Sequence, residues 1–208
     1  KKLKGDKLPK DTLAIMELAT GKMVKFPALK SVEIPREGGN FIAFKVEHKE
    51  ALPDSLKQNK KAKPKTEVIT VIYDLGANMV SDTLKEVDVL SFNKKGDRLL
   101  CIAKGKDYKE LYAYNPATKE QKSILRTGKK GEILKPQLSA NEEFIAFYAN
   151  TDTTKKIDEN VEIYTYSLYA EDAKAQKVID NTIAGIPAGM LVSRNRSLNT
   201  NKEGSRLF

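Results

Sequence analysis

The residues that could carry out covalent chemistry are few. The 208-residue chain contains one cysteine, Cys101, and one histidine, His48. A Ser-His-Asp or Cys-His arrangement would therefore have to use His48. One cysteine also excludes an internal disulfide framework and a cysteine-rich zinc site. No Gly-x-Ser-x-Gly sequence, the nucleophile elbow of α/β-hydrolases, occurs in the chain.

Ser91 and Lys94 match the Ser-x-x-Lys spacing of some acyl-transfer enzymes. That spacing needs a helical turn to bring the amine beside the hydroxyl, whereas Ser91 lies where a predicted strand enters a turn. Cys101 lies within an apolar strand, and His48 follows another strand beside a charged loop. We interpret Cys101 as a small buried strand residue and His48 as a surface histidine. The sequence therefore predicts no catalytic residue.

Two segments could be read as ion-binding sites. Lys57 to Lys65 (KQNKKAKPK) clusters lysines of the kind that neutralise phosphates, but no aromatic residue lies between Leu56 and Thr70. We interpret it as a solvated loop, with polyanion binding as the alternative. Residues 151–160 (TDTTKKIDEN) carry oxygen ligands suited to calcium, but two lysines interrupt them and the EF-hand spacing is missing. We predict no metal, no cofactor and no nucleic-acid partner.

Internal repeats organise the chain. The segments REGGNFIAFK (36–45), KKGDRLLCIA (94–103) and SANEEFIAFY (139–148) each place a turn before a strand, and KEGSRLF (202–208) begins a fourth. Their first apolar strand positions are Phe41, Leu99, Phe144 and Leu207. Two positions later comes a small residue, Ala43, Cys101 or Ala146. The pattern predicts one repeated strand with loop insertions between its copies.

A second repeated position alternates with the first along the chain. It holds Met16, Tyr73, Tyr114 and Tyr166, and the next position holds Glu17, Asp74, Asn115 or Ser167, polar residues suited to the beginning of a turn. The tyrosines could form a ligand-stacking ladder. Their recurrence at one strand position favours packing between sheets instead.

Short strands with turn signals every 8 to 12 residues or so are typical of a sandwich, barrel or propeller, and the repeat favours the propeller. We predict an all-β fold, a partial β-propeller of four-stranded antiparallel blades with about four blades' worth of strands. Residues 1–10 are a basic linker or tail, and 11–208 form an incomplete arc with blades broken near 30, 87, 131 and 188. We expect a fragment that starts in the third strand of one blade and stops in the second strand of a fifth. The only weak helical pattern covers Tyr169 to Val178.

Composition agrees with a globular β-protein. Hydrophobic residues make up 40% and charged residues 31% of the chain. No apolar run approaches the roughly 18 residues of a membrane span, and no signal peptide is visible. The net charge of +9 is concentrated in Lys1 to Lys10 and Lys57 to Lys65, which we read as solvated.

The residues also resemble a known family. KDTLAIMELATGKMVKFPALKSVEIPREGGNFIAFKVE, together with LSFNKKGDRLLCIAKG, resembles the N-terminal β-propeller of bacterial (Bacteroidetes-type) secreted serine peptidases of the prolyl oligopeptidase family. SFNKKGDRL resembles that family's Phe-Ser-x-Asp-Gly-x-x-Leu blade turn, and ELYAYNPATKE its strand-to-turn element. The resemblance implies a non-catalytic segment that restricts the access of peptide substrates to a C-terminal α/β-hydrolase domain of the same polypeptide. It also implies a periplasmic or secreted location.

Some positions depart from the family pattern. Asn93, Lys94 and Lys95 replace its Ser-x-Asp, and the turn from Leu138 to Phe144 reads as one residue short. Glu142 and Glu143 are not assigned the substrate-amine role of the family's glutamate pair, because the surrounding aromatic motif is absent. The alternative function is a stand-alone binding or scaffold propeller in the periplasm.

Overall fold

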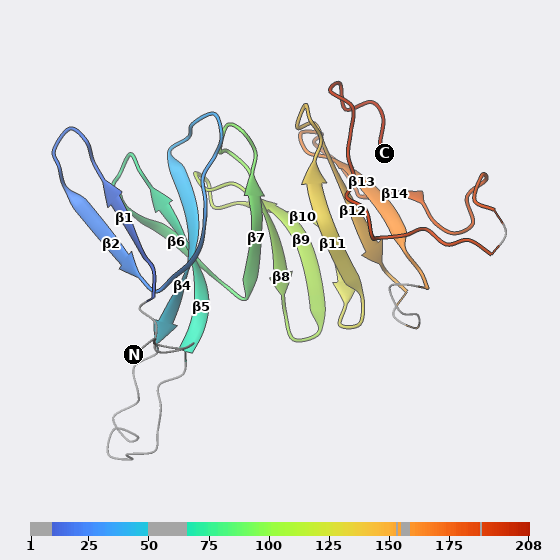
Figure 1. The fold of residues 1–208 in the computed structure, drawn as a ribbon, viewed down its shortest axis with the longest axis horizontal. Helices are drawn as coiled ribbons and strands as arrows, with labels where there is room; N and C mark the ends of the chain where they lie inside the picture. Colours follow the sequence, from blue (N-terminus) through green and yellow to red (C-terminus); the bar gives the residue numbers. More distant parts are fainter. Residues whose placement is uncertain (1–9, 50–65, 153, 155–158, 188) are drawn as a thin grey trace, which may run out of the picture.

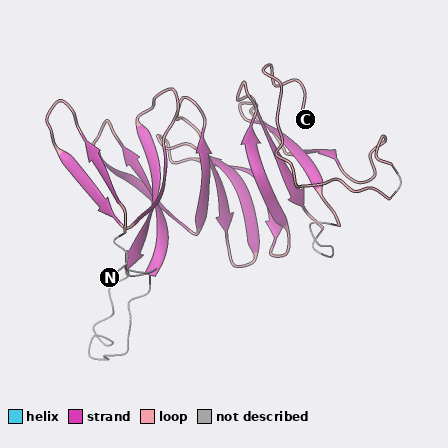
Figure 2. Ribbon diagram, in the orientation of Figure 1, coloured by secondary structure: helices cyan, strands magenta, loops and turns pink. Residues whose placement is uncertain are grey.

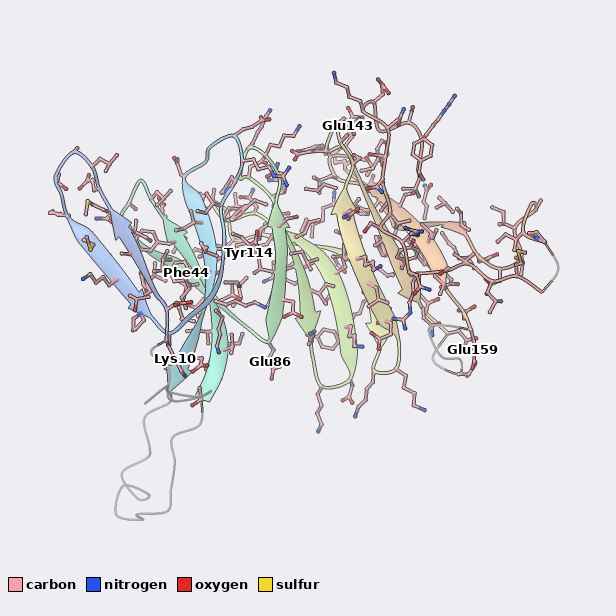
Figure 3. All side chains as sticks on the ribbon, in the orientation of Figure 1. Lys10, Phe44, Glu86, Tyr114, Glu143 and Glu159 are labelled. Carbon is pink, nitrogen blue, oxygen red and sulfur yellow. The ribbon has the colours of Figure 1, made fainter. Side chains whose placement is uncertain are left out.

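The chain folds into a row of antiparallel β-sheets. The computed structural model describes residues 10–49, 66–152, 154, 159–187 and 189–208. This part of the chain consists of strands, turns and loops, without a helix (Figure 2). The sheets follow one another in chain order along the longest axis of the molecule (Figure 1). The predicted all-β fold and partial propeller are confirmed.

In the described residues, fourteen strands form one hairpin and three four-stranded sheets. The N-terminal hairpin contains β1 (Thr12–Met16) and β2 (Met23–Pro27). Blade 1 contains β3 (Leu29–Glu33), β4 (Phe41–Lys49), β5 (Thr66–Asp74) and β6 (Met79–Lys85). Blade 2 contains β7 (Val87–Phe92), β8 (Leu99–Lys104), β9 (Tyr108–Tyr114) and β10 (Gln121–Gly128). Blade 3 contains β11 (Glu132–Leu138), β12 (Phe144–Asn150), β13 (Glu162–Ser167) and β14 (Gln176–Ile179).

Strands within a blade pair with their neighbours in sequence, as in β7, β8, β9 and β10. The inner strands of a blade have neighbours on both faces, so β8 reads as the continuous apolar run LLCIA and its first four residues are buried. The edge strand β10 alternates exposed and buried side chains instead. Tyr169 to Val178, the weak helical pattern, is not a helix: residues 169–175 form a loop, and residues 176–178 belong to β14.

The polar residues after Tyr73 and Tyr114 close their turns, as predicted. The Asp74 carboxylate accepts a hydrogen bond from the Ala77 N–H at 2.9 Å. The Asn115 side-chain oxygen accepts from the N–H groups of Ala117 and Thr118 at 3.0 and 3.3 Å. These are Asx-type turns, in which a short polar side chain replaces a backbone partner.

Each blade packs face to face on the next, and apolar clusters fill the interfaces. The interface between blades 1 and 2 is formed by Ala43, Ile72, Leu84, Phe92, Leu99, Cys101, Tyr112 and Tyr114. The interface between blades 2 and 3 is larger and consists of Leu100, Ile102, Leu111, Ala113, Ile124, Ile133, Ile145, Phe147, Ala149, Tyr164, Tyr166 and Leu168. Burial of these apolar surfaces stabilises the row of sheets.

Tyr114 and Tyr166 lie in these interfaces, and Tyr73 lies in the equivalent cluster between the N-terminal hairpin and blade 1. Tyr73, Tyr114 and Tyr166 are 1%, 0% and 1% exposed, so their predicted packing role is confirmed. The Tyr73 hydroxyl donates to the Asn78 side-chain oxygen within blade 1. The Tyr114 hydroxyl donates at 2.6 Å to the Asp82 carboxylate, which belongs to blade 1. The buried Tyr166 hydroxyl has no hydrogen-bond partner among the described residues.

The strand register corrects the predicted alignment of blade 2. Tyr73, Tyr114 and Tyr166 lie opposite Ile42, Leu99 and Ile145, so Leu99 corresponds to Ile42 and not to Phe41. Cys101 is therefore equivalent to Phe44 and Phe147, all on the face that packs against the preceding sheet. The predicted equivalence of Cys101 with Ala43 and Ala146 is wrong by one residue. In a strand, one residue is enough to exchange the two faces.

The same shift corrects the turn of blade 3. The Asn93 N–H bonds to the Arg98 carbonyl, and the Ser139 N–H bonds to the Phe144 carbonyl, so both turns span the same number of residues. The Leu138 to Phe144 turn is therefore not one residue short. Its apparent shortness came from aligning Phe144 with Leu99.

The C-terminal hairpin repeats the turn of blade 2. Thr200 forms a β-bridge with Leu207, and Asn199 exchanges backbone hydrogen bonds with Phe208. Asn201 accepts from the Arg206 N–H as Asn93 does from the Arg98 N–H, at 2.8 and 3.0 Å. The segment KEGSRLF therefore begins a further unit of the repeat, as predicted.

Candidate binding groove between blades 2 and 3

A groove with a volume of about 800 Å³ lies between β7 of blade 2 and β11 of blade 3. Both are first strands and therefore edge strands of their blades. The first strands of blades 1 and 2, β3 and β7, contact each other, which places first strands on the inner side of the arc. In a propeller this side faces the central channel.

Strand β11 presents an irregular edge to the groove. Its register with β12 shifts between Leu134 and Gln137, and Lys135 in this bulge has a φ of 48°. The next residue, Pro136, has no N–H to donate. Bulges and prolines block the addition of another strand, so β11 leaves the groove open to ligands held by side chains.

Lys135 also fixes a positive charge at the groove. Its ammonium donates to the backbone carbonyls of Arg194, Asn195 and Arg196 at 2.8, 3.3 and 3.4 Å. Carbonyl oxygens satisfy the donors of an ammonium without neutralising its charge. The groove therefore keeps a cation whose position is held by the segment before the C-terminal hairpin.

The turn end of the groove joins blades 2 and 3. The Lys94 backbone N–H donates to both carboxylate oxygens of Glu142 at 3.0 Å. The Lys94 ammonium lies 3.4 Å from the Ala140 carbonyl and 3.9 Å from a Glu37 carboxylate oxygen. Glu142 has a φ of 61°, in the left-handed region that favours glycine.

Glycine occupies the equivalent position in the other two turns. The N–H groups of Gly96, Glu142 and Gly204 bond to the carbonyls of Asn93, Ser139 and Asn201, which begin their turns. Gly96 has a φ of 76°, and a Cβ added there would lie 2.6 Å from the ring of Pro35 in blade 1. Glu142 thus exchanges the conformational freedom of glycine for a carboxylate that binds the neighbouring blade.

Further hydrogen bonds connect the equivalent turns of the other blades. The Glu37 N–H of blade 1 donates to the Lys94 carbonyl at 3.0 Å. In blade 3, the Ala140 N–H donates to the Thr200 hydroxyl at 2.9 Å and the Asn141 amide to the Glu203 carbonyl at 2.8 Å. We call this series of bonded turns the turn ladder. Sequence reasoning missed it, although a glutamate in a glycine position was a visible signal.

Ser91 and Lys94 both line the groove but do not form a catalytic pair. Ser91 is paired with Leu100 in the sheet, and Lys94 directs its amine to the Ala140 carbonyl. Among the described residues, no hydrogen bond joins the Ser91 hydroxyl to a base. A nucleophile needs such a partner, so the arrangement supports binding rather than acyl transfer.

Cys101 and His48 lie away from the groove lining. Cys101 is 0% exposed, and burial raises the pKa of its thiol to about 12, against the opposing effects of a Tyr112 hydrogen bond and the Lys45 charge. The thiol therefore stays protonated and unreactive at neutral pH. His48 is exposed, but it lies inside β4 opposite Glu67 rather than after the strand.

Most of the two segments that we considered as ion-binding sites lies outside the described residues. Residues 57–65 and 153 and 155–158 lie outside the described residues, as do 1–9. Within the described part, no group of three or more His, Cys, Asp or Glu side chains is placed to hold a metal ion. The same part of the chain contains no helix long and apolar enough to cross a membrane.

Solved structures of propellers are similar to this fold. The β-propeller domain of the Trilobed protease from Pyrococcus furiosus, which has an open velcro topology, matches 73% of this chain and 43% of its own, at 14% identity and a TM-score of 0.50. A eukaryotic initiation factor matches 95% of this chain and 42% of its own, at 13% identity and a TM-score of 0.53. A prolyl endopeptidase structure matches 83% of this chain and 28% of its own, at 11% identity and a TM-score of 0.47.

The two likenesses with TM-scores of 0.50 and 0.53 agree with the row of four-stranded sheets and define the class of the chain as a β-propeller arc. The chain spans less than half the length of each of these three structures. No protein-family model matches the chain, and the comparison with curated protein sequences gives no match. Identities this low show the fold alone.

Proposed function

We propose that this chain is the non-catalytic propeller segment of a prolyl-oligopeptidase-like serine peptidase of the periplasm or the secreted fraction. In this role it restricts the access of peptide substrates to an α/β-hydrolase domain of the same polypeptide. The groove between the first strands β7 and β11 carries the proposal, because it lies on the side of the arc that would face the central channel of a propeller, through which a substrate would pass.

Three further observations support this role. A solved protease contains a propeller domain of similar fold. The single cysteine is buried and the pKa of its thiol is raised, and the single histidine is exposed in β4 opposite a glutamate. The side chains at the groove are suited to contact a peptide and lack an activated nucleophile within the described residues.

The first test is the sequence that follows Phe208 in the gene. A Gly-x-Ser-x-Gly elbow followed by aspartate and histidine supports the peptidase. A stop codon after a few more blades selects the alternative, a stand-alone binding or scaffold propeller.

The second test compares activity with and without the rest of the polypeptide. The 208-residue chain alone should hydrolyse no peptide or ester, and active-site serine reagents should not label it. The full polypeptide should cleave short peptides and leave a folded protein carrying the same cleavage sequence intact. Equal cleavage of both substrates would contradict the access role.

A further inference from the structure

We propose that the groove between β7 and β11 binds the free α-carboxylate of a short peptide, with Arg36 and Lys94 as the anion-binding residues. This inference rests on the proposed function and adds a class of ligand to it: short peptides with an unblocked C-terminus. The carboxylate lies at the turn end of the groove, and the peptide runs along β11.

The charge of the groove favours an anion. Its charged lining residues are Arg36, Lys94, Lys135 and Glu142, three cations and one anion. The Glu142 carboxylate is occupied by the Lys94 backbone N–H, which binds both of its oxygens. The Lys135 ammonium is held by neutral carbonyls and keeps its charge. The positive charge at the groove therefore exceeds the negative charge.

Arg36 is available for a ligand. It lies on the exposed turn between β3 and β4, and its guanidinium makes no hydrogen bond or ion pair with another described residue. A planar guanidinium binds a carboxylate through two parallel N–H···O bonds. The Lys94 ammonium is held only by contacts of 3.4 and 3.9 Å, so it can turn toward an anion beside Arg36.

The remaining lining is mostly apolar, but three polar side chains within it favour a peptide over other carboxylates such as fatty acids. The side chains of Ser91, Gln137 and Asn199 line the groove and make no hydrogen bond to other described residues. They offer donors and acceptors for peptide N–H and C=O groups, whereas a hydrocarbon tail would leave them without partners at a cost. The volume of about 800 Å³ falls within the range of pockets that enclose small ligands.

The bulged edge of β11 limits how the peptide binds. Because Pro136 and the register shift prevent strand addition, the backbone of the peptide gains few sheet hydrogen bonds. Most of the binding energy then comes from the carboxylate. We expect weak dependence on peptide sequence and strong dependence on the charge of the C-terminus.

The experiment is isothermal titration calorimetry on the 208-residue chain with one short peptide in two forms, the free acid and the C-terminal amide. The acid should bind about tenfold more tightly or better, as expected for hydrogen bonds to a charged group. Arg36→Gln should lower the affinity for the acid several-fold, toward that for the amide, because only Lys94 then remains to bind the carboxylate. Lys25→Gln, which removes an exposed charge from β2, is the matched control and should change neither.

Equal binding of acid and amide by the unmodified chain would overturn the inference without any variant. If Arg36→Gln bound the acid as tightly as the unmodified chain does, the assignment of the carboxylate to this site would be wrong. A straight-chain fatty acid of similar length should bind more weakly, and equal binding would contradict the peptide part. If the gene encodes no hydrolase elbow but the difference between acid and amide holds, the proposed function fails and the groove inference stands.

Discussion

The two interfaces of blade 2 differ in how they are held together. Against blade 1, polar pairs cross the boundary: Lys45 to Asp88 at 2.8 Å and Tyr114 to Asp82 at 2.6 Å. Against blade 3, polar contacts such as Lys109 to Glu132 at 2.7 Å also cross the boundary. A larger apolar cluster fills it, however, and the Tyr166 hydroxyl has no partner among the described residues. The interface tyrosine of the repeat thus has a polar partner at one boundary, in Tyr114, and none among the described residues at the other, in Tyr166.

Equivalent positions explain the difference. Cys101 faces blade 1 where the larger Phe147 of blade 3 faces blade 2. Asp82 lies opposite Ile72 and accepts from Tyr114, whereas its counterpart Lys122, opposite Ala113, donates instead to the carbonyls of Ala170 and Glu171. A blade can therefore replace apolar volume with satisfied polar pairs, provided each buried group finds its partner.

The largest expected difference in stability is between the alanine variants of Phe147 and Cys101. Phe147→Ala should lower the free energy of unfolding by about 3–5 kcal/mol, because a fully buried ring that stacks on Tyr164 is lost. Cys101→Ala, at the equivalent position, should cost about 1 kcal/mol. Urea denaturation followed by circular dichroism measures both. Equal losses would show that the two interfaces do not differ in apolar packing.

The next largest difference in stability is expected between the phenylalanine variants of the two interface tyrosines, Tyr114 and Tyr166. Tyr114→Phe should cost about 1.5–3 kcal/mol, because the Asp82 carboxylate loses its buried donor. Tyr166→Phe should be neutral or stabilising, since it removes a buried hydroxyl that has no partner in the described structure. Denaturant midpoints of the two variants give the comparison. A similar loss for Tyr166→Phe would reveal a partner for that hydroxyl.

The turn ladder gives a smaller effect. Glu142→Ala should cost about 1–2 kcal/mol, because the bonds to the Lys94 N–H are lost while a side chain remains in the left-handed conformation. Glu142→Gly loses the same bonds but relieves the backbone, so it should be about 1 kcal/mol more stable than the alanine variant. The reverse order in thermal unfolding would refute this account of position 142.

The smallest effect concerns the ion pair between blades 1 and 2. Burial raises the pKa of Asp88, but the hydrogen bonds from Lys104 and Lys45 together outweigh it, and the net pKa is lowered. A lowered pKa contributes stability that is present above the unfolded value of about 4 and is lost as the pH falls. Asp88→Asn should cost less than about 1 kcal/mol at neutral pH, since the carboxylate is partly exposed. The difference from the unmodified chain should vanish in acid, and a difference that persisted there would contradict the electrostatic origin.

The sequence predicts the fold better than it predicts the groove. Strand runs such as LLCIA and the tyrosine repeat reflect local packing, so they identified the sheets. The position of Cys101 could not be settled from residue size, because a small residue is tolerated on either face when polar pairs hold the interface. Only the hydrogen-bonded register of the strands showed that Leu99 is equivalent to Ile42 and not to Phe41.

The groove depends on residues that are distant in the sequence. Arg36, Ser91 and Lys135 come from three different blades, and no local pattern connects them. The left-handed conformation of Glu142 and the carbonyls around Lys135 depend on neighbouring blades as well. Such contacts arise from the stacking of the sheets, which a single sequence does not specify.

The strand order also bears on how the chain acquires its structure during synthesis. Each strand of a blade pairs with its neighbour in sequence, so the contacts within a blade span short stretches of chain and close quickly. A blade can therefore form as soon as its fourth strand leaves the ribosome, and it then offers its free face to the next blade. The nascent chain should mature stepwise from the N-terminal hairpin, with each finished sheet serving as the template on which the following sheet settles.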